Sequence, residues 1–188
     1  MQKYELVLML DAALQEKERQ DTLSALEKEI KGCILKKDEI GLKQTAYDLE
    51  RKRGNNNFYF YSYYLEAENE NLDAIKKQLL YNKAVARYFI YKMRETEEFF
   101  MFEDLQKILN TALEGREEKK TGQKVDFFMD KANKKYLVWK ALPVLKKYMT
   151  RFGSIKPRKY TKNKVLIQKK VKQAIIRARE IGLLEYIK

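Results

Sequence analysis

The side chains of this sequence that could do chemistry are mostly cationic, and they are concentrated near its C-terminus. Residues 119–188 contain 21 of the 40 Lys and Arg but only 4 of the 27 Asp and Glu. Their formal charge is therefore +17, whereas residues 1–118 carry 19 basic and 23 acidic side chains, which sum to −4. A polyanion lowers the free energy of such a segment most, because each neutralised phosphate releases condensed counterions. The charge pattern predicts that this segment binds a polyanion.

The cations must be positioned by a loop and a helix. Residues 153–160 are predicted to form a loop, and residues 164–181 a helix capped by Thr161 or Asn163. Apolar residues recur on one face of that helix and basic residues on the other. The predicted phosphate contacts on these two elements are Lys156, Arg158, Lys159, Lys162, Lys164, Lys169, Lys172, Arg177 and Arg179.

Membrane association is the less favoured explanation of the same charges. Lysines would also be attracted to an anionic membrane surface, but an interfacial helix needs bulky exposed anchors on its apolar face. Ala174 and Ala178 on that face suit close packing against protein instead. No apolar run approaches the roughly 20 residues that cross a bilayer, and the first residues lack the cleavage site of a secretory signal. We therefore expect a cytoplasmic protein.

Enzymatic chemistry finds little support. The sequence has one Cys and no His, which excludes an internal disulfide and a Cys-rich zinc site and removes the commonest metal ligand. It has no Gly-rich phosphate loop and no nucleophile set beside a base. Cys33 is interpreted as a small buried residue rather than a reactive thiol. We expect no catalysis, no metal, no cofactor and no small-molecule substrate.

The residues before the basic segment predict an α+β fold. Residues 1–94 show the order β-α-β-β-α-β, which is the ferredoxin-like plan of a four-stranded antiparallel sheet with two helices on one face. The predicted strands are residues 4–10, 33–48, 58–65 and 84–92, and the predicted helices are residues 13–31 and 72–81. Residues 95–123 are predicted to be an acidic linker that is partly helical. Residues 124–188 are predicted to form a small basic domain that is mostly α-helical. Its first helix is expected over residues 137–150, started or broken near Pro143.

The strand predicted at residues 58–65 is almost wholly aromatic, which leaves three interpretations. Half of its side chains must face the helices as core, and the other half could meet a protein partner. The outward set could also stack on unpaired RNA bases, as in RNA-recognition modules, or simply be exposed. Arg53 and Gly54 match the signature of those modules only loosely, because three Asn intervene. Core together with a protein interface is the favoured interpretation.

The C-terminal part resembles a known family. It contains Gly153, Ile155, Pro157, Arg158 and Thr161, and then Gln168, Ala174, Ile175, Arg177, Ala178, Arg179, Leu183, Leu184 and Tyr186. In order, spacing and chemistry these residues, within about 124–188, resemble bacterial small-subunit ribosomal protein eighteen. Lys162, Lys169, Gly182 and Glu185 depart from the family pattern. The Cys pairs of some members are missing, so the resemblance implies no zinc.

The front part is similar to small-subunit ribosomal protein six. Residues 3–6, Lys-Tyr-Glu-Leu, open the first strand, and residues 41–47, Gly-Leu-Lys-Gln-Thr-Ala-Tyr, lie on the second. Both stretches resemble motifs of that family, with departures at Thr45 and Asp48. The resemblance covers residues 1 to about 94, and that family has the ferredoxin-like fold.

The two resemblances together imply a fusion. In bacteria the two families pair on the platform of the small subunit and bind the central domain of its rRNA. The chain is thus expected to be a ribosome-associated, structural rRNA-binding protein whose partners are small-subunit rRNA and neighbouring small-subunit proteins. Weaker RNA contacts are expected from Arg51, Lys52, Arg53, Arg87 and Arg94, and an interface between the domains from Leu137, Val138, Trp139, Tyr61 and Tyr63.

Two alternatives remain open at this point. The same basic surface could serve a regulatory protein that binds a messenger leader away from the ribosome. The chain could also be a non-enzymatic adaptor whose basic part docks acidic proteins.

Overall fold

The computed structural model describes residues 2–49, 56–94, 97–118 and 126–186. The chain divides into two compact units: unit 1 is Met1–Gln44 with Asn55–Phe99, and unit 2 is Thr45–Gly54 with Phe100–Lys188. This division differs from the predicted boundaries at residues 94 and 123. A helix that begins at Phe102 belongs to unit 2, and so does the segment that follows residue 44.

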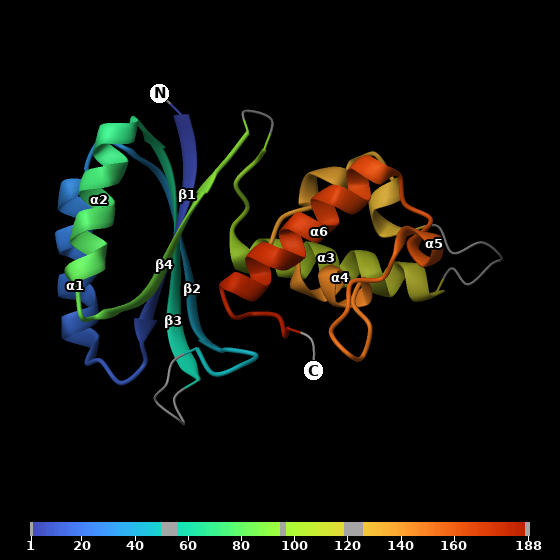
Figure 1. Cartoon of the computed structure of the whole chain (residues 1–188), viewed down its shortest axis with the longest axis horizontal. Coiled ribbons are helices and arrows are strands. Elements are labelled where there is room, and N and C mark those ends of the chain that lie inside the picture. The colour runs from blue at the N-terminus through green and yellow to red at the C-terminus, as the bar shows by residue number, and fades with distance from the viewer. Residues whose placement is uncertain (1, 50–55, 95–96, 119–125, 187–188) are drawn as a thin grey trace. The chain divides into compact units, whose positions relative to one another are not determined.

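Unit 1 is an antiparallel four-stranded sheet with two helices side by side on one face (Figure 1). Its elements are β1 (Gln2–Asp11), α1 (Glu16–Glu29), β2 (Ile34–Gln44), β3 (Asn57–Ala67), α2 (Asn69–Tyr81) and β4 (Val85–Lys92). The strand order is β2-β3-β1-β4, so that β1 and β3 are central and β2 and β4 are the edges. The predicted ferredoxin-like plan is confirmed.

Local sequence explains where the first helix begins and ends. Glu16 and Glu18 occupy the first turn of α1, where the helix dipole favours negative charge. Beyond its C-terminal end, Gly32 has φ of 139°, a backbone conformation that residues with a side chain rarely adopt.

The helix-covered face of the sheet holds the core of unit 1. Its β1 and β3 members alternate along each strand and are opposed in register, with Leu6 opposite Tyr63 and Leu8 opposite Tyr61. The helices contribute Leu23, Leu26, Ile30, Leu72, Ile75 and Leu79. Tyr61 and Tyr63 thus lie beneath the helices. Their assignment to an interface between domains is corrected, because the two-residue period of β3 turns odd-numbered side chains into this core.

The opposite face of the sheet is also rich in aromatic side chains. The described helices of unit 1 leave this face uncovered. On it, the Ser62 hydroxyl donates to Glu5 Oε1 at 2.9 Å, and the Tyr64 ring stacks on Phe99 with centroids 5.5 Å apart. One ring of the aromatic strand is therefore used inside unit 1 itself. The expectation that half of the side chains of this strand form core is confirmed, and the structure shows that this half is the odd-numbered one.

Unit 2 is helical, as predicted. Its elements are α3 (Phe102–Glu118), η1 (Phe127–Met129), η2 (Ala132–Tyr136), α4 (Leu142–Lys147), α5 (Arg158–Thr161) and α6 (Val165–Glu180). The predicted apolar face of α6 is buried at Ile167, Val171, Ala174, Ile175 and Ala178. Helix α4 contacts both α3 and α6, and the Phe128 ring stacks on Tyr148 with centroids 5.5 Å apart.

Three local expectations for unit 2 are corrected. The helix expected over residues 137–150 is only the six residues of α4, with Pro143 in its first turn, where a missing N–H does no harm. The residue at the N-cap of α6 is Lys164, and neither Thr161 nor Asn163 caps it. Helix α3 runs from Phe102 to Glu118, whereas the sequence predicts only a short helix over residues 103–113 in the linker. Among the described residues, no helix is long and apolar enough to span a bilayer.

Candidate nucleic-acid interface

Helices α5 and α6 display most of the predicted phosphate contacts on the surface of unit 2. The exposed members are Arg158, Lys159, Lys162, Lys164, Lys169 and Lys172. Lys156 and Arg177 are half-buried. The Lys156 ammonium donates to the carbonyl of Lys147 at 2.8 Å, so part of its hydrogen-bonding capacity is already used within the protein.

The cationic surface extends beyond the predicted residues. Between Lys131 and Arg179 the sequence has 17 Lys and Arg and no Asp or Glu. Seven further cations of this stretch that the prediction omitted are exposed: Lys131, Lys134, Lys135, Lys146, Lys147, Arg151 and Lys170. The absence of Asp and Glu could have predicted these cations, because η2, α4 and the turn after α4 lack carboxylates just as α5 and α6 up to Arg179 do.

The loop and α5 are held against α6 by one glutamine. The Gln168 amide donates to the carbonyl of Lys156 at 2.9 Å and accepts from the Thr161 hydroxyl at 3.0 Å. Lys162 follows the last residue of α5 as its C-cap, with a left-handed φ of 55° and an N–H that donates to the Arg158 carbonyl at 2.9 Å. The cations of α5 are thus carried on a braced turn.

Arg179 is the one predicted phosphate contact that the structure contradicts. Its side chain is only 8% exposed. The guanidinium donates to the carbonyl of Gly153 and, at 3.0 Å, to that of Glu185, and it lies over the Tyr186 ring. Spacing could have revealed this, because Arg179 follows the buried Ile175 by four residues and shares its helix face. Arg179 is a positioning residue that ties the turn at Gly153 to the C-terminal segment.

A short segment after β2 belongs to the same unit as α6. The predicted strand at 33–48 ends at Gln44, and the N–H of Ala46 donates to the carbonyl of Gly182 at 2.7 Å. The Tyr47 hydroxyl donates to the carbonyl of Arg179 at 2.6 Å, and its ring meets Tyr186 edge-on. Residues 45–49 therefore pack at the C-terminal end of α6.

The weaker candidates of the front domain are less well placed. Arg51, Lys52 and Arg53 lie outside the described residues. Arg94 is exposed, whereas Arg87 is half-buried on β4 opposite Met9. Of the predicted interface residues in unit 2, Leu137 and Val138 are half-buried and Trp139 is buried.

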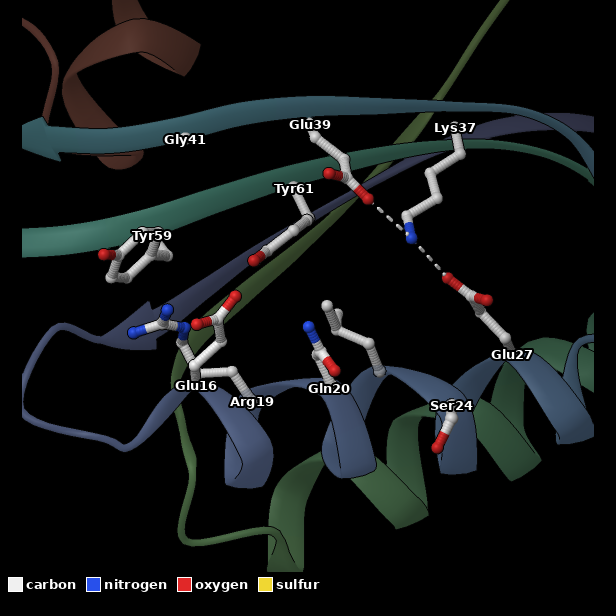
Figure 2. Close-up of a pocket in the computed structure, with 11 residues that line it drawn as sticks. Glu16, Arg19, Gln20, Ser24, Glu27, Lys37, Glu39, Gly41, Tyr59 and Tyr61 are labelled. Carbon is white, nitrogen blue, oxygen red and sulfur yellow. Dashed lines mark ion pairs between the residues drawn. The ribbon is translucent and has the colours of Figure 1, made fainter.

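Unit 1 contains a separate polar pocket of about 350 Å³ between α1 and the strands β2 and β3. Figure 2 shows Lys37 of β2 between two carboxylates, with its Nζ 2.9 Å from Glu27 Oε1 and 2.8 Å from Glu39 Oε1. The Arg19 guanidinium lies 3.7 Å from the centroid of the Tyr59 ring. The cations that line the pocket thus already have partners within unit 1.

The same pairing accounts for the electrostatics of the pocket. Partial burial opposes ionisation of Glu27, but bonds from Lys37 and Tyr63 outweigh it and lower the pKa of the carboxyl. Burial also opposes the charge of Lys37, and its bonds to Glu39 and Glu27 reverse this and raise the pKa of the ammonium. Burial and the bond to Glu27 raise the pKa of Tyr63. These shifts are the consequence of the ion pairs and the hydrogen bond that join α1 to β2 and β3.

In the part of the chain that the structure describes, no three Cys, Asp or Glu side chains form a group that could hold a metal ion. Cys33 is half-buried and reduced, and its sulfur lies 3.8 Å from the amide nitrogen of Asn71.

Comparison with known families separates the two parts of the chain. Residues 3–92 match the family model of ribosomal protein S6, and residues 133–184 match that of ribosomal protein S18. The small ribosomal subunit protein bS18 of Mycoplasma capricolum is 40% identical over 68 residues, which cover 36% of this chain and 89% of that protein. The bS18 of Alkaliphilus metalliredigens is 42% identical over 72 residues, covering 38% and 92%.

A solved structure resembles the front part. The crystal structure of 30S ribosomal protein S6 from Thermotoga maritima aligns with a TM-score of 0.44 and 19% identity. The alignment covers 60% of this chain and 97% of that one.

Proposed function

We propose that this chain, which belongs to the ribosomal protein S18 family and carries a ribosomal protein S6 domain ahead of its S18 domain, binds the central domain of small-subunit rRNA. As a small-subunit ribosomal protein it acts by binding and shaping RNA, and its partners are that rRNA and the neighbouring proteins of the platform. Its place in the cell is the ribosome.

One observation supports the proposal most directly. The exposed cations of α5 and α6 lie in a stretch without a carboxylate, on a turn that Gln168 braces against α6. Any group of cations attracts phosphates. Cations held in a rigid arrangement favour an RNA whose phosphates have a matching spacing. We therefore assign the contact to folded RNA, recognised by shape more than by sequence.

The second part of the proposal concerns the two domains. Leu137, Val138 and Trp139 are proposed to pack against the face of the unit 1 sheet that no described helix of unit 1 covers. A tether makes such docking intramolecular, with an effective concentration on the order of millimolar for a short flexible connection. Docking would let the near-neutral S6 domain hold the basic S18 domain in one orientation on the RNA.

Charge reversal tests the RNA contact. In a filter-binding titration with a central-domain rRNA fragment, the double variant Arg158→Glu and Arg177→Glu is expected to bind at least about tenfold more weakly than the unaltered chain, because two attractive contacts become repulsive. The control reverses the same number of charges on exposed lysines of α1 and α2, Lys28→Glu and Lys77→Glu. Equal affinity of the two double variants would overturn the assignment to α5 and α6.

The docking is tested by unfolding the whole chain. Fluorescence of Trp139, the only Trp in the sequence, reports on unit 2, and far-ultraviolet circular dichroism reports on the secondary structure of both units. Docked domains are expected to unfold in one transition seen at the same urea concentration by both probes. Two separated transitions would show that the domains fold independently and would contradict the docking.

A further inference from the structure

Two aromatic side chains of unit 2, Phe152 and Tyr160, are more exposed than the other rings that the structure describes in that unit. Phe127, Phe128, Trp139 and Tyr148 are each no more than 5% exposed, whereas Phe152 is 58% exposed and Tyr160 is 73% exposed. A single exposed ring needs no explanation on an ordinary surface. These two require one because of where they lie and how they are held.

Both rings sit among cations. The Arg151 guanidinium lies 4.8 Å from the centroid of the Phe152 ring. Tyr160 belongs to α5, and the exposed Arg158, Lys159 and Lys162 surround it in the sequence. Both rings fall within the stretch from Lys131 to Arg179 that has no carboxylate. A partner that contacts either ring must therefore carry anionic groups close to the point of contact, where the cations can neutralise them.

Both rings are also carried on turns that α6 holds in place. Phe152 lies in a turn closed by the Met149–Ile155 bridge and by the bond from the Thr150 N–H to the Ser154 carbonyl at 2.8 Å. The buried Arg179 guanidinium binds the carbonyl of the next residue, Gly153. Tyr160 stands on α5, which Thr161 ties to α6 through Gln168. Rings presented on fixed turns lose little conformational entropy when a flat group stacks on them.

RNA is the partner that offers phosphates and flat apolar rings together. Stacking of a base on an aromatic side chain contributes about 1–3 kcal/mol per base and works for any base. In an RNA duplex the bases already stack on one another, so only unpaired nucleotides are available. We propose that Phe152 and Tyr160 are base-stacking residues, which hold unpaired nucleotides of the RNA whose phosphates the neighbouring cations bind. This proposal rests on the RNA binding proposed above and adds the kind of RNA structure that is recognised.

The test compares two RNAs and three forms of the full-length chain. The probes are a single-stranded RNA and a duplex RNA of equal length, and the chains are the unaltered protein, the Phe152→Leu and Tyr160→Leu double variant, and the conservative Phe152→Tyr and Tyr160→Phe double variant. The leucine variant keeps apolar side chains but loses both π faces. It is expected to bind the single strand about tenfold or more weakly and the duplex unchanged, while the conservative variant binds both as the unaltered chain does.

The salt dependence separates stacking from charge. Because no cation is removed, the slope of log affinity against log salt for the single strand is expected to be the same for the leucine variant and the unaltered chain. The matched variant Lys159→Gln and Lys162→Gln should instead reduce that slope by about 2 and weaken binding to both RNAs. Circular dichroism confirms that each variant is folded.

Each failure has its own signature. If the leucine variant binds the single strand as tightly as the unaltered chain, the assignment of Phe152 and Tyr160 as base-stacking residues is wrong, and a protein is the remaining partner for the two rings. If the unaltered chain binds neither RNA, the RNA-binding function itself is wrong.

Discussion

At the scale of single residues, the identity of a side chain was a poorer guide to its role than its position on an element. Arg158 and Arg179 are both arginines of a basic segment, yet the first is exposed and the second is buried against backbone carbonyls. A buried guanidinium stabilises a fold only when its donors are satisfied. Arg179 meets this condition through Gly153 and Glu185, so its loss should be seen in stability.

The substitution Arg179→Met tests this role. It removes two hydrogen bonds from a charged donor and leaves the carbonyls of Gly153 and Glu185 without that partner, which is expected to lower the free energy of unfolding by about 2–4 kcal/mol. Urea unfolding followed by Trp139 fluorescence measures it. The control Lys172→Met removes an exposed cation from the same helix and should change stability by no more than about 0.5 kcal/mol. Equal effects of the two substitutions would show that Arg179 is not a brace.

At the scale of elements, the periodicity of the sequence predicted most of the fold. Runs rich in apolar and aromatic residues located the four strands, and the spacing of apolar residues located α1, α2 and α6 to within a few residues. The face of β3 that meets the helices could not be predicted. Aromatic residues occupy both parities of that strand, so no polar residue pattern marks the solvent side, and Tyr61 and Tyr63 were assigned to the wrong face.

The ends of elements were also beyond sequence reasoning where tertiary contacts decide them. β2 stops at Gln44 because Ala46 and Tyr47 bond to the backbone of Gly182 and Arg179, which lie 130 or more residues away in the chain. α4 is short although its sequence has helical spacing on both sides of Pro143. Most of the cationic site was predictable from charge alone, whereas its bracing by Gln168 and Arg179 depends on contacts that no local pattern encodes.

The packing of residues 45–49 at the end of α6 depends on the lack of a side chain at Gly182. A Cβ there would lie 3.1 Å from Leu49 Cδ2 and 3.2 Å from Thr45 Cγ2, and φ is +89°. Gly182→Ala should therefore combine backbone strain of roughly 1–2 kcal/mol with a steric clash. Gly41→Ala is the matched control, because φ is +78° and nothing lies within 4 Å of the added Cβ.

We expect Gly182→Ala to lower the free energy of unfolding more than Gly41→Ala does, by about 1 kcal/mol or more. Urea titrations of both variants at neutral pH measure the difference. An equal decrease in the free energy of unfolding for both variants would mean that residues 45–49 can move away from Gly182 and are not fixed on α6.

The contact between α1 and the sheet carries a pH dependence. Burial, and then the 2.9 Å bond that the Tyr63 hydroxyl donates to Glu27, raise the pKa of Tyr63 above its ordinary value. A group whose pKa is raised by folding contributes stability that is complete below its unfolded pKa, about 10, and is lost as the pH rises toward the folded value.

The variant Tyr63→Phe should thus be less stable than the unaltered chain at pH 7, by roughly 1–2 kcal/mol for the lost bond. Above pH 10 its stability should fall less steeply with pH, because it lacks this titrating group. Urea unfolding between pH 7 and pH 11 measures both effects. Tyr81→Phe, at an 82% exposed site, serves as the control and should reproduce the unaltered curve. A parallel decline of the Tyr63→Phe and unaltered curves above pH 10 would contradict the assignment.

At the scale of the whole molecule, the chain joins a near-neutral sheet domain to a strongly basic helical one. The two family matches, to S6 over residues 3–92 and to S18 over residues 133–184, coincide with this change of charge. Helix α3, which lies between the matched ranges, belongs to unit 2. A covalent link keeps the two domains at equal numbers and at high local concentration, which would favour the joint binding to one RNA site that we propose.

The most direct test of this account is sedimentation of the full-length chain with ribosomal particles from its own cells, followed by ultraviolet crosslinking to RNA. The chain is predicted to migrate with the small subunit in a sucrose gradient and to crosslink through unit 2 to the central domain of the small-subunit rRNA. The association should weaken steeply as salt is raised. A chain that stays at the top of the gradient, and crosslinks only to messenger RNA or binds a protein partner after nuclease treatment, would contradict it.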